Sequence, residues 1–445
     1  MDTIAAIATA SGIGSISIVR VSGPNAYLIA QKLSHKEEFT PRVATLSYLH
    51  DTYNDPIDQA IIVYFKAPHS FTAEDVVEFQ CHGGSIVGRM VLEAIIAMGG
   101  RLAHPGEFSK RAFLNGRIDL SEAEAIAALI ETKSVDAAKM LTRQLKGELR
   151  DFVLHVRELL IDILAYVEVN IDYAEEDLPL DMLKQIEERL INLRAKLFST
   201  YESSKRRSGL INGFKIAIVG KPNVGKSSLL NALLNYDRAI ISDIAGTTRD
   251  TIEEEIRIGT HLVKIVDTAG IREAHDVIEK IGIERSILAI EESQIVIAMF
   301  DNSRINDDED IQILNILDEY GINKHILKVL NKSDLEQKFD QTLLGENLIL
   351  LDCKKNSDAI ILHVKNILDA TMVDDSVMLT SLRQIEVVKK AYENIEQSVE
   401  FLNFGQLELF AFHINVAIES ISSITSAYER DEILDKMFGS FCLGK

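Results

Sequence analysis

The segment from Lys215 to Ser228 constrains the fold of this chain most. It reads K-I-A-I-V-G-K-P-N-V-G-K-S-S, an apolar strand that runs into a glycine loop and then into a helix. Gly220 and Gly225 let the backbone turn tightly around phosphate oxygens, and the loop N–H groups and the helix N-terminus face the anion. Lys226 adds a positive charge, and the hydroxyl of the next residue is placed to ligate Mg²⁺. The full pattern predicts a nucleoside triphosphate site in an α/β domain.

Two further motifs follow predicted strands and identify the base. Asp267 to Gly270 reads D-T-A-G, where the carboxylate is placed to hold Mg²⁺ through water and Gly270 offers its N–H to a γ-phosphate. Asn331 to Asp334 reads N-K-S-D, and its last carboxylate can accept hydrogen bonds from N1–H and the 2-amino group of guanine. Adenine has no 2-amino group, so we expect GTP. The expected GTP contacts in the three motifs are Asn223, Val224, Gly225, Lys226, Ser227, Ser228, Asp267, Thr268, Ala269, Gly270, Asn331, Lys332, Ser333 and Asp334.

The segment between the first two motifs has the features of a switch loop. It reads D-I-A-G-T-T-R-D at 243–250, and we expect Thr248 to join Ser227 as a Mg²⁺ ligand. After Gly270 comes Ile271, where many GTPases have a glutamine that orients the attacking water. Hydrolysis therefore needs another residue to position the attacking water, and a cation in place of an arginine finger. The downstream candidates are Arg272, Glu273, Asp276 and Glu279, of which a carboxylate could position the water. The sequence alone does not distinguish among them.

Composition limits the remaining classes of function. The 445 residues suggest roughly three domains. No run reaches the ~18 uncharged apolar residues of a membrane span, and the first residues lack the basic region of a signal peptide. The three cysteines show no C-x-x-C spacing, which argues against a disulfide framework or a zinc site. A net charge of −21 argues against a general electrostatic grip on nucleic acid. We expect a cytoplasmic protein with no membrane association.

The patterning along the chain predicts four segments. Residues 1–118 mix strand-like runs, such as 15–21 and 60–65, with a helix near 87–98, which predicts a small α+β domain. Residues 119–210 are helical: a capping box at Ser121 to Glu124 opens a long helical segment to about Ile171, and another helix spans 183–207 before a boundary marked by Ser208-Gly209 and Asn212-Gly213. Residues 211–373 alternate strands and helices as in a doubly wound sheet, and residues 374–445 return to helical periodicity. The predicted fold is multidomain, α/β plus α, with a Ras-like G domain inserted into a helical domain.

Several longer runs resemble the MnmE (TrmE) family of bacterial tRNA-modification GTPases. The central runs are I-S-D-I-A-G-T-T-R-D-T-I at 241–252, D-T-A-G-I-R-E-A at 267–274 and I-E-K-I-G-I-E-R at 278–285. The ends of the chain carry S-F-T-A-E-D-V-V-E-F-Q-C-H-G-G at 70–84, H-P-G-E-F-S-K-R-A-F-L-N-G-R-I-D-L-S-E-A-E-A at 104–125 and F-C-L-G-K at 441–445. The resemblance therefore covers essentially the whole chain, including parts that other G proteins do not share.

For the GTPase, the resemblance implies a K⁺ ion in place of the arginine finger. Asn223 and the loop from Ser242 to Thr247 would hold this ion, and the water-orienting carboxylate would be Glu279. The K⁺ ligands would be Asn223, Ser242, Ile244 and Thr247, and the same loop would add Ser242, Asp243, Ile244, Ala245, Gly246, Thr247 and Thr248 to the GTP site. One element departs from the family: the S-A-K sequence that supports guanine reads Cys353-Lys354-Lys355 here.

For the N-terminal domain, the resemblance implies a folate site and a constitutive homodimer. The residues that match the family's site for 5-formyl- or methylene-tetrahydrofolate are Arg20, Glu78, Arg117 and Lys445. Arg117 stands where some relatives have lysine, so the charge is kept. Cys442 matches a cysteine that the family needs for modification, and we predict that it lies in the active site.

The implied function is modification of tRNA with a flavin-dependent partner protein, MnmG, in a heterotetramer. The family installs an aminomethyl-type (carboxymethylaminomethyl) group at C5 of the wobble uridine, position 34, and the amine comes from glycine or ammonium. A regulatory or ribosome-assembly GTPase that acts only as a switch is the main alternative, although no KH-type G-x-x-G loop or second G domain is present. A folate enzyme with a vestigial G domain is a third reading, which the intact nucleotide motifs disfavour.

Overall fold

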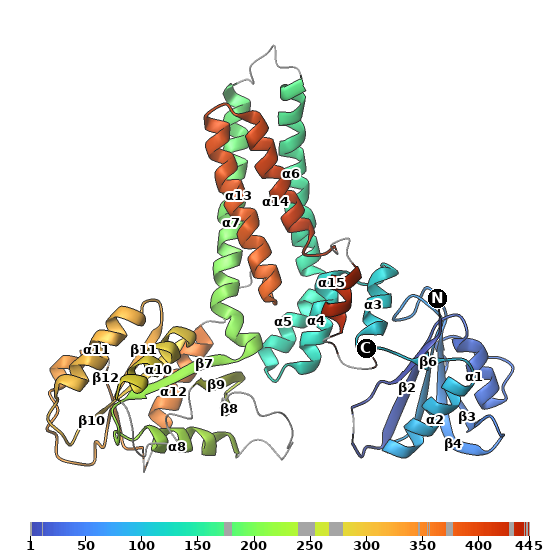
Figure 1. The fold of residues 1–445 in the computed structure, drawn as a ribbon, viewed down its shortest axis with the longest axis horizontal. Coiled ribbons are helices and arrows are strands. Elements are labelled where there is room, and N and C mark those ends of the chain that lie inside the picture. The colour runs from blue at the N-terminus through green and yellow to red at the C-terminus, as the bar shows by residue number, and fades with distance from the viewer. Residues whose placement is uncertain are drawn as a thin grey trace. The chain divides into compact units, whose positions relative to one another are not determined.

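The computed structural model describes most of the chain and divides it into two compact units. The first unit comprises Met1–Ile130, Gln144–Ala195 and Glu386–Lys445, and the second comprises Glu131–Arg143 and Lys196–Ile385 (Figure 1). Each unit thus combines segments that are far apart in the sequence. The described residues are all except Met1, Ser11, 173–179, 239–253, 267–278, 346–347, Lys354, Asn356, 371–376, 427–430, Ser440, Cys442, Leu443 and Lys445.

The N-terminal part of the first unit is a mixed sheet with helices, which confirms the predicted α+β class. The strand order is β3-β4-β5-β2-β1-β6, antiparallel except for the pairing of β1 with β6. Its elements are β1 (Ile4–Ile7), β2 (Ile16–Ser22), α1 (Ala26–Ser34), β3 (Thr45–His50), β4 (Pro56–Phe65), β5 (Val76–His82), α2 (Ser85–Ala97), β6 (Arg101–Leu102) and α3 (Glu107–Leu114).

One face of this sheet is buried under α1 and α2. Val19 of β2, Ile62 of β4 and Phe79 of β5 pack there against Ile29 and Ile95 of the two helices. The opposite face is covered near β1, where Phe108 of α3 contributes to a second small cluster. Period-two alternation of the strands therefore leaves part of that second face free for other contacts.

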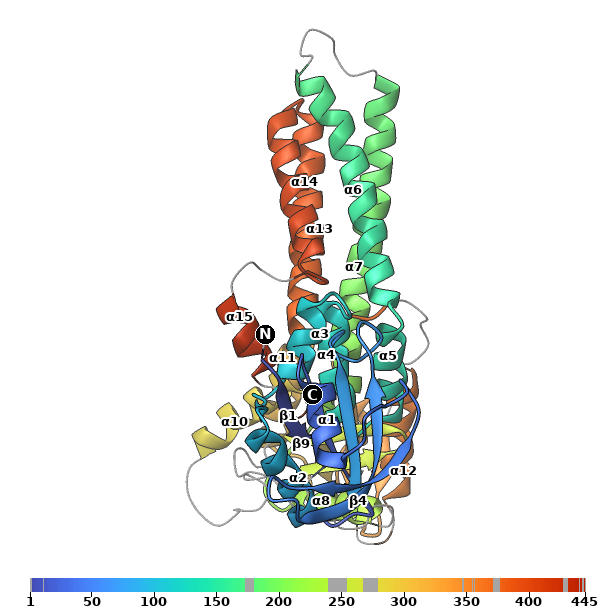
Figure 2. The same ribbon diagram turned by 90° about the vertical axis from the view of Figure 1, so that its right-hand side faces the viewer.

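The helical part of the first unit is an antiparallel bundle. Its members are α6 (Glu148–Asp172), α7 (Leu180–Asn212) up to Ala195, α13 (Leu382–Asn403) from Glu386, and α14 (Leu407–Ser422). In this bundle α14 packs along α6 (Figure 2). The apolar residues predicted at three- and four-residue spacing, from Leu149 to Val167, form the buried stripe of α6. None of the helices in the described part of the chain has a stretch apolar enough to span a membrane.

The predicted helix boundaries need three corrections. The segment to Ile171 is three helices, α4 (Leu120–Glu131), α5 (Val135–Leu145) and α6, not one. The capping box lies two residues earlier than Ser121, because the Asp119 carboxylate accepts the Glu122 N–H at 2.8 Å and the Glu122 carboxylate accepts the Asp119 N–H at 2.9 Å. Finally, α7 continues through Ser208-Gly209 and ends at Asn212, where the second predicted boundary signal, Asn212-Gly213, stands. Gly209 is needed there for close packing, since a Cβ would lie 2.5 Å from the Phe214 ring.

The second unit is built on a parallel sheet with one antiparallel edge strand. Its order is β12-β11-β10-β7-β9-β8, and only β8 runs antiparallel to its neighbour. This is the doubly wound arrangement that the strand–helix alternation predicts. Its elements are β7 (Phe214–Gly220), α8 (Lys226–Arg238), β8 (Glu254–Ile258), β9 (His261–Val266), α10 (Glu279–Glu292), β10 (Ile295–Asp301), α11 (Asp308–Tyr320), β11 (His325–Asn331), a 3₁₀ helix (Gln341–Leu344), β12 (Leu348–Leu351) and α12 (Asp358–Ala370).

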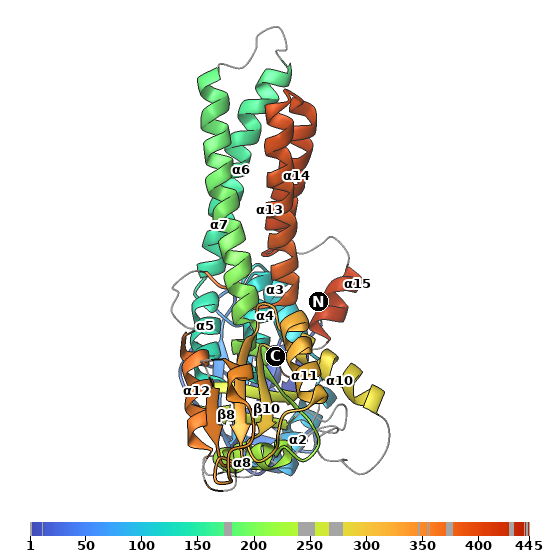
Figure 3. The ribbon, with the colours of Figure 1, turned by 90° about the vertical axis from the view of Figure 1, so that its left-hand side faces the viewer.

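Helices cover both faces of this sheet. Ile216 and Ile218 of β7 face α8 and α12, where they pack with Leu229 and Val364. The alternate residues of the same strand, Ala217 and Val219, belong to the cluster formed with α10 and α11 (Figure 3). A strand buried on both sides explains why the sequence of β7 is a continuous apolar run.

The C-terminal segment packs on the N-terminal part of the first unit. α15 (Asp431–Phe438) contacts α3, and the Phe438 ring lies 5.2 Å from that of Phe441. Gly444 lies so close to β1 that a Cβ there would be 2.6 Å from the Ile7 carbonyl oxygen. Its φ of 91° also favours glycine. Gly444 therefore has a defined place beside the N-terminal sheet.

Substituting Gly444 tests this contact. We expect Gly444→Ala to release the C-terminal residues, because the added methyl group overlaps Ile7, and carboxypeptidase should then remove the end of the chain several-fold faster than in the unmodified protein. Gly405→Ala is the matched control, since φ there is 70° but no atom lies within 4 Å of the added Cβ. Equal protection in both variants would show that the tail is not held at Gly444.

Candidate functional site

The glycine loop that joins β7 to α8 lies at the carboxyl edge of the parallel sheet, where the strand order changes direction. β7 lies between β10 and β9, which is the position where doubly wound sheets bind nucleotides. Gly220 has a φ of 149° and Gly225 a φ of 108°. A Cβ on Gly220 would lie 2.5 Å from the Met299 carbonyl oxygen, and one on Gly225 would lie 2.2 Å from the Asn331 side chain. Close backbone approach thus requires both glycines.

Lys226 folds back over this loop. Its ammonium group donates to the carbonyl oxygens of Gly220 at 2.6 Å and Lys221 at 2.8 Å. Burial lowers the pKa of Lys226 from its ordinary value to about 8. Phosphate oxygens in the loop would favour the charged form, so this lysine is suited to bind an anion.

Asn331 joins the glycine loop to the base-reading loop. Its side-chain amide donates to the Val224 carbonyl oxygen at 2.7 Å, and its side-chain oxygen accepts the Cys353 N–H at 3.1 Å. The predicted loop from Asn331 to Asp334 therefore lies beside Asn223–Ser228, as a single nucleotide site requires. The contact at Cys353 also places the segment that departs from the family's S-A-K sequence next to this loop.

Lys332 is held in the same loop by a buried carboxylate. It has a φ of 63°, and its ammonium group lies 2.5 Å from Asp301 at the end of β10. Burial alone would raise the pKa of Asp301, but hydrogen bonds from Lys332 and Ser303 outweigh it and lower the pKa. This ion pair holds Lys332 in the loop that also carries Asp334, and Asp334 is exposed there.

Lys221 is a positioning residue that the sequence reasoning missed. Its ammonium group lies 2.7 Å from Asp307 and 2.8 Å from Asp310, both at the start of α11, and its side chain is 7% exposed. Burial opposes a positive charge, but the two carboxylates prevail and raise the pKa of Lys221. The D-x-x-D spacing at 307–310, which forms a capping box, was the sequence signal that could have indicated these two carboxylates.

The remaining predicted nucleotide and metal residues lie outside the part of the chain that the structure describes. These are the switch residues Ser242–Thr248 and the motif Asp267–Gly270. Glu279 is the first residue of α10, and the position of its side chain is not described. The structure thus brings together two of the three GTP motifs.

A second polar site lies in the N-terminal part of the first unit, on the face of the sheet away from α1 and α2. Arg20 of β2 and Glu78 of β5 are direct cross-strand neighbours, and their side chains form an ion pair of 2.8 Å with a second bond of 2.9 Å from Nε. The Arg20 guanidinium lies 5.3 Å from the Phe71 ring centre and 5.8 Å from that of Phe108. It also donates to the Gly444 carbonyl oxygen at 3.4 Å. Residues from both ends of the chain therefore meet at Arg20.

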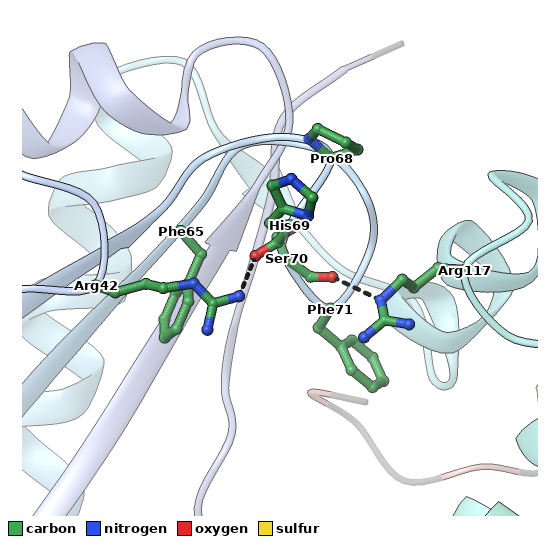
Figure 4. Close-up of a pocket in the computed structure, with 7 residues that line it drawn as sticks. All are labelled: Arg42, Phe65, Pro68, His69, Ser70, Phe71 and Arg117. Atoms are coloured by element: carbon green, nitrogen blue, oxygen red, sulfur yellow. Dashed lines mark hydrogen bonds between the residues drawn. The ribbon is translucent and has the colours of Figure 1, made fainter. Parts of the chain in front are cut away.

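Arg117 reaches the same region through a neighbouring loop. Its Nε donates to the Ser70 carbonyl oxygen at 3.3 Å, and Ser70 precedes the Phe71 ring that lies against Arg20 (Figure 4). Of the predicted folate and active-site residues, the structure pairs Arg20 with Glu78 and places Arg117 against the loop that carries Phe71. Cys442 and Lys445 lie outside the described residues, although Gly444 between them is described.

Removing the Asn331 side chain should separate the two nucleotide loops. We expect Asn331→Ala to weaken GDP binding about tenfold or more, because the Val224 carbonyl and the Cys353 N–H both lose a buried partner at about 1–3 kcal/mol per group. Fluorescence titration with a labelled GDP measures this. Gln144→Ala is the matched control, since Gln144 is similarly buried but belongs to the first unit, where its amide donates to the Ser121 carbonyl oxygen at 3.0 Å. Unchanged affinity for GDP in Asn331→Ala would contradict the assignment.

Comparison with known proteins places the chain in a family. The family model described as "GTP-binding protein TrmE N-terminus" matches residues 3–117, and the model "MnmE helical domain" matches residues 120–442. Proteins named "tRNA modification GTPase MnmE" from Sulfurimonas denitrificans and Aliarcobacter butzleri are each 59% identical to this chain over 444 residues. The protein of that name from Nitratiruptor sp. is 60% identical over 444 residues. In all three cases the match covers 100% of this chain and 99% of the relative.

These matches extend over the glycine loop, the Asn331–Asp334 loop and the Arg20–Glu78 site alike. The chain belongs to the MnmE (TrmE) family of tRNA modification GTPases.

Proposed function

We propose that this chain is a K⁺-activated GTPase that modifies the wobble uridine of tRNA with a folate one-carbon unit. With a flavin-dependent partner, MnmG, it would install an aminomethyl-type group at C5 of that base. The observation that carries this proposal is the convergence of Arg20, Glu78 and Gly444 in a chain that also has a GTP site. A GTPase that acts only as a switch has no need of such a second site, which disfavours that alternative.

GTP and Mg²⁺ would be bound at the loops of the second unit. Lys226 and the N–H groups of the glycine loop suit the phosphates, and Asp334 suits guanine. Ser227 is exposed at the start of α8 and would be one protein ligand of Mg²⁺, and Thr248 would be the second. Asp267 would act through water.

K⁺ activation is proposed because Ile271 cannot orient water and Asn223 is suitably placed to hold a cation. Asn223 lies exposed in the glycine loop with a φ of 63°, and its side chain makes no hydrogen bond to another residue that the structure describes. Its amide oxygen is thus available to a cation together with Ser242, Ile244 and Thr247. A bound K⁺ would neutralise the charge that develops on the phosphates. Glu279 would orient the attacking water from the start of α10.

The folate would occupy the Arg20–Glu78 site. A carboxylate suits the N–H groups of a pterin, and cations suit the carboxylates of the glutamyl group. Phe71 and Phe108 supply apolar ring surface close to Arg20. Lys445 and Cys442 would join the site from the C-terminal segment, which Gly444 ties to Arg20.

A homodimer is proposed through the uncovered face of the N-terminal sheet. Leu46 of β3 pairs with Ile61 of β4, and both are exposed, as are Tyr48 and Ile16 on the same face. Exposed apolar residues grouped in this way are typical of a protein interface. Arg20 and Glu78 belong to the same face, so a second copy bound there would lie near the folate site.

The dependence of GTP turnover on the monovalent cation tests K⁺ activation. We expect GTP turnover in KCl to exceed turnover in NaCl of equal ionic strength by about tenfold or more, the scale of one lost charge-stabilising contact in phosphoryl transfer. Asn223→Gly should abolish the difference, because glycine keeps the left-handed backbone and removes only the amide. Asn231→Ala, on the exposed side of α8, is the control and should keep it. Equal rates in both salts would refute K⁺ activation.

The affinity for folate tests the Arg20–Glu78 site. Calorimetry with 5-formyl-tetrahydrofolate should show binding to the full chain and at least about tenfold weaker binding to Arg20→Ala and to Glu78→Gln, because each variant removes a charge-assisted hydrogen bond. Arg89→Ala, which removes an exposed arginine from α2 on the covered side of the sheet, should bind normally. Identical affinities for Arg20→Ala and the unmodified chain would remove the site.

A further inference from the structure

A cavity of about 470 Å³ lies beside the Arg20–Glu78 site, in the N-terminal part of the first unit. A loop that follows β4 forms its centre, and two arginines from distant parts of the chain flank this loop (Figure 4). Its lining contains two cations and two aromatic rings but no carboxylate. The lining residues are Arg42, Phe65, Pro68, His69, Ser70, Phe71 and Arg117.

The two arginines are held by neighbouring carbonyl groups of this loop. Arg42 donates to the His69 carbonyl oxygen at 2.8 Å, and Arg117 donates to the next one, that of Ser70, at 3.3 Å. Neither guanidinium forms an ion pair with a carboxylate among the residues that the structure describes. Since a guanidinium has five N–H donors, each arginine retains donors for an anion in the cavity.

The position of Arg42 depends on an unusual backbone conformation. Its φ is 63°, its own N–H donates to the Tyr64 carbonyl oxygen at 2.8 Å, and its guanidinium lies 5.9 Å from the Phe65 ring centre. A left-handed conformation is unfavourable for a residue with a Cβ and persists where the surroundings enforce it. The turn therefore presents the Arg42 side chain at the edge of the cavity.

The cavity and the proposed folate site share the Phe71 ring. This ring lines the cavity and also lies 5.3 Å from the guanidinium carbon of Arg20. A ligand that occupied the Arg20–Glu78 site could thus extend past Phe71 toward Arg117 and Arg42. Because the cavity has cations and no carboxylate, the extending part would be anionic.

We propose that this cavity binds the chain of γ-linked glutamyl carboxylates of a polyglutamylated folate, with Arg42 as a residue that recognises the glutamates beyond the first. The inference rests on the proposed folate function and names the form of folate that the site prefers. A phosphate of tRNA is the other anion to consider. The Phe71 ring that the cavity shares with the Arg20 site, together with the Phe65 ring in the lining, favours a small-molecule tail.

The test compares two ligands and three variants of the full chain by calorimetry. The ligands are 5-formyl-tetrahydrofolate with one glutamate and with five. The unmodified chain should bind the pentaglutamate about tenfold or more tightly than the monoglutamate. Arg42→Asn should bind both equally, with the monoglutamate affinity unchanged. Asparagine tolerates a left-handed conformation but is too short to reach the tail, so the loop should keep its shape.

Two further variants separate the possible causes. Arg42→Lys should retain part of the preference, because it keeps the charge without the planar fork. Arg89→Ala, which removes one positive charge from α2 of the same part of the unit, should retain all of it. A preference lost in Arg89→Ala as well would reflect net charge alone and would overturn the proposal.

The outcomes that contradict this inference differ from those that contradict the proposed function. Equal binding of the two ligands to the unmodified chain, or an undiminished preference in Arg42→Asn, would overturn the tail site while leaving the folate site intact. Binding of neither ligand would overturn both. Weaker tRNA binding by Arg42→Asn in a filter assay, with the preference for the pentaglutamate kept, would assign the cavity to a phosphate instead.

Discussion

The parallel pairing of β7, β10 and β11 is the constraint on which the nucleotide site depends. Gly220 at the end of β7 is paired with Met299, and Asn331 at the end of β11 is paired with Asp301, two residues further along β10. The ends of three strands therefore lie at one edge, and the loops that follow them are neighbours. Asn331 can then reach back to Val224, and Lys332 can reach Asp301. Burial of the strands on both faces keeps this register, because a shift would expose apolar side chains.

The two proposed sites are connected along the chain by its helical segments. The stretch that follows the parallel sheet leads through α13 and α14 to α15 and ends at Gly444, which bonds Arg20. The segment that follows the second unit in the sequence thus reaches the proposed folate site. This arrangement suits a protein in which GTP hydrolysis drives a conformational step and the chemistry on tRNA occurs elsewhere.

Local sequence was sufficient to predict the elements whose backbone is fixed by a few residues. The glycine loop, the Asn331–Asp334 loop and the buried stripe of α6 all follow from short patterns with a definite conformation. Pairings between distant residues could not be predicted in this way. Lys221 with Asp310, and Arg42 with the His69 carbonyl, depend on tertiary contacts that no short pattern encodes. Gly209 misled the boundary prediction, since it stands in a helix to make room for the Phe214 ring and not to end the helix.

The residues proposed to bind folate needed a different source of information. Arg20 and Glu78 are single charged residues in otherwise ordinary strands, and only the resemblance to a family selected them from the sequence. The structure adds that antiparallel pairing of β2 with β5 places them opposite each other on one face. Neither the strand pairing nor the carbonyl of Gly444 beside Arg20 could be read from residues so far apart.

The account as a whole is tested most directly by the tRNA of a strain that lacks this chain. Mass spectrometry of wobble-position nucleosides should show that the C5 aminomethyl-type group is lost from uridine and that it returns when the chain is supplied again. An unchanged set of modified wobble uridines in the deletion strain would contradict the account and leave a GTPase that acts only as a switch.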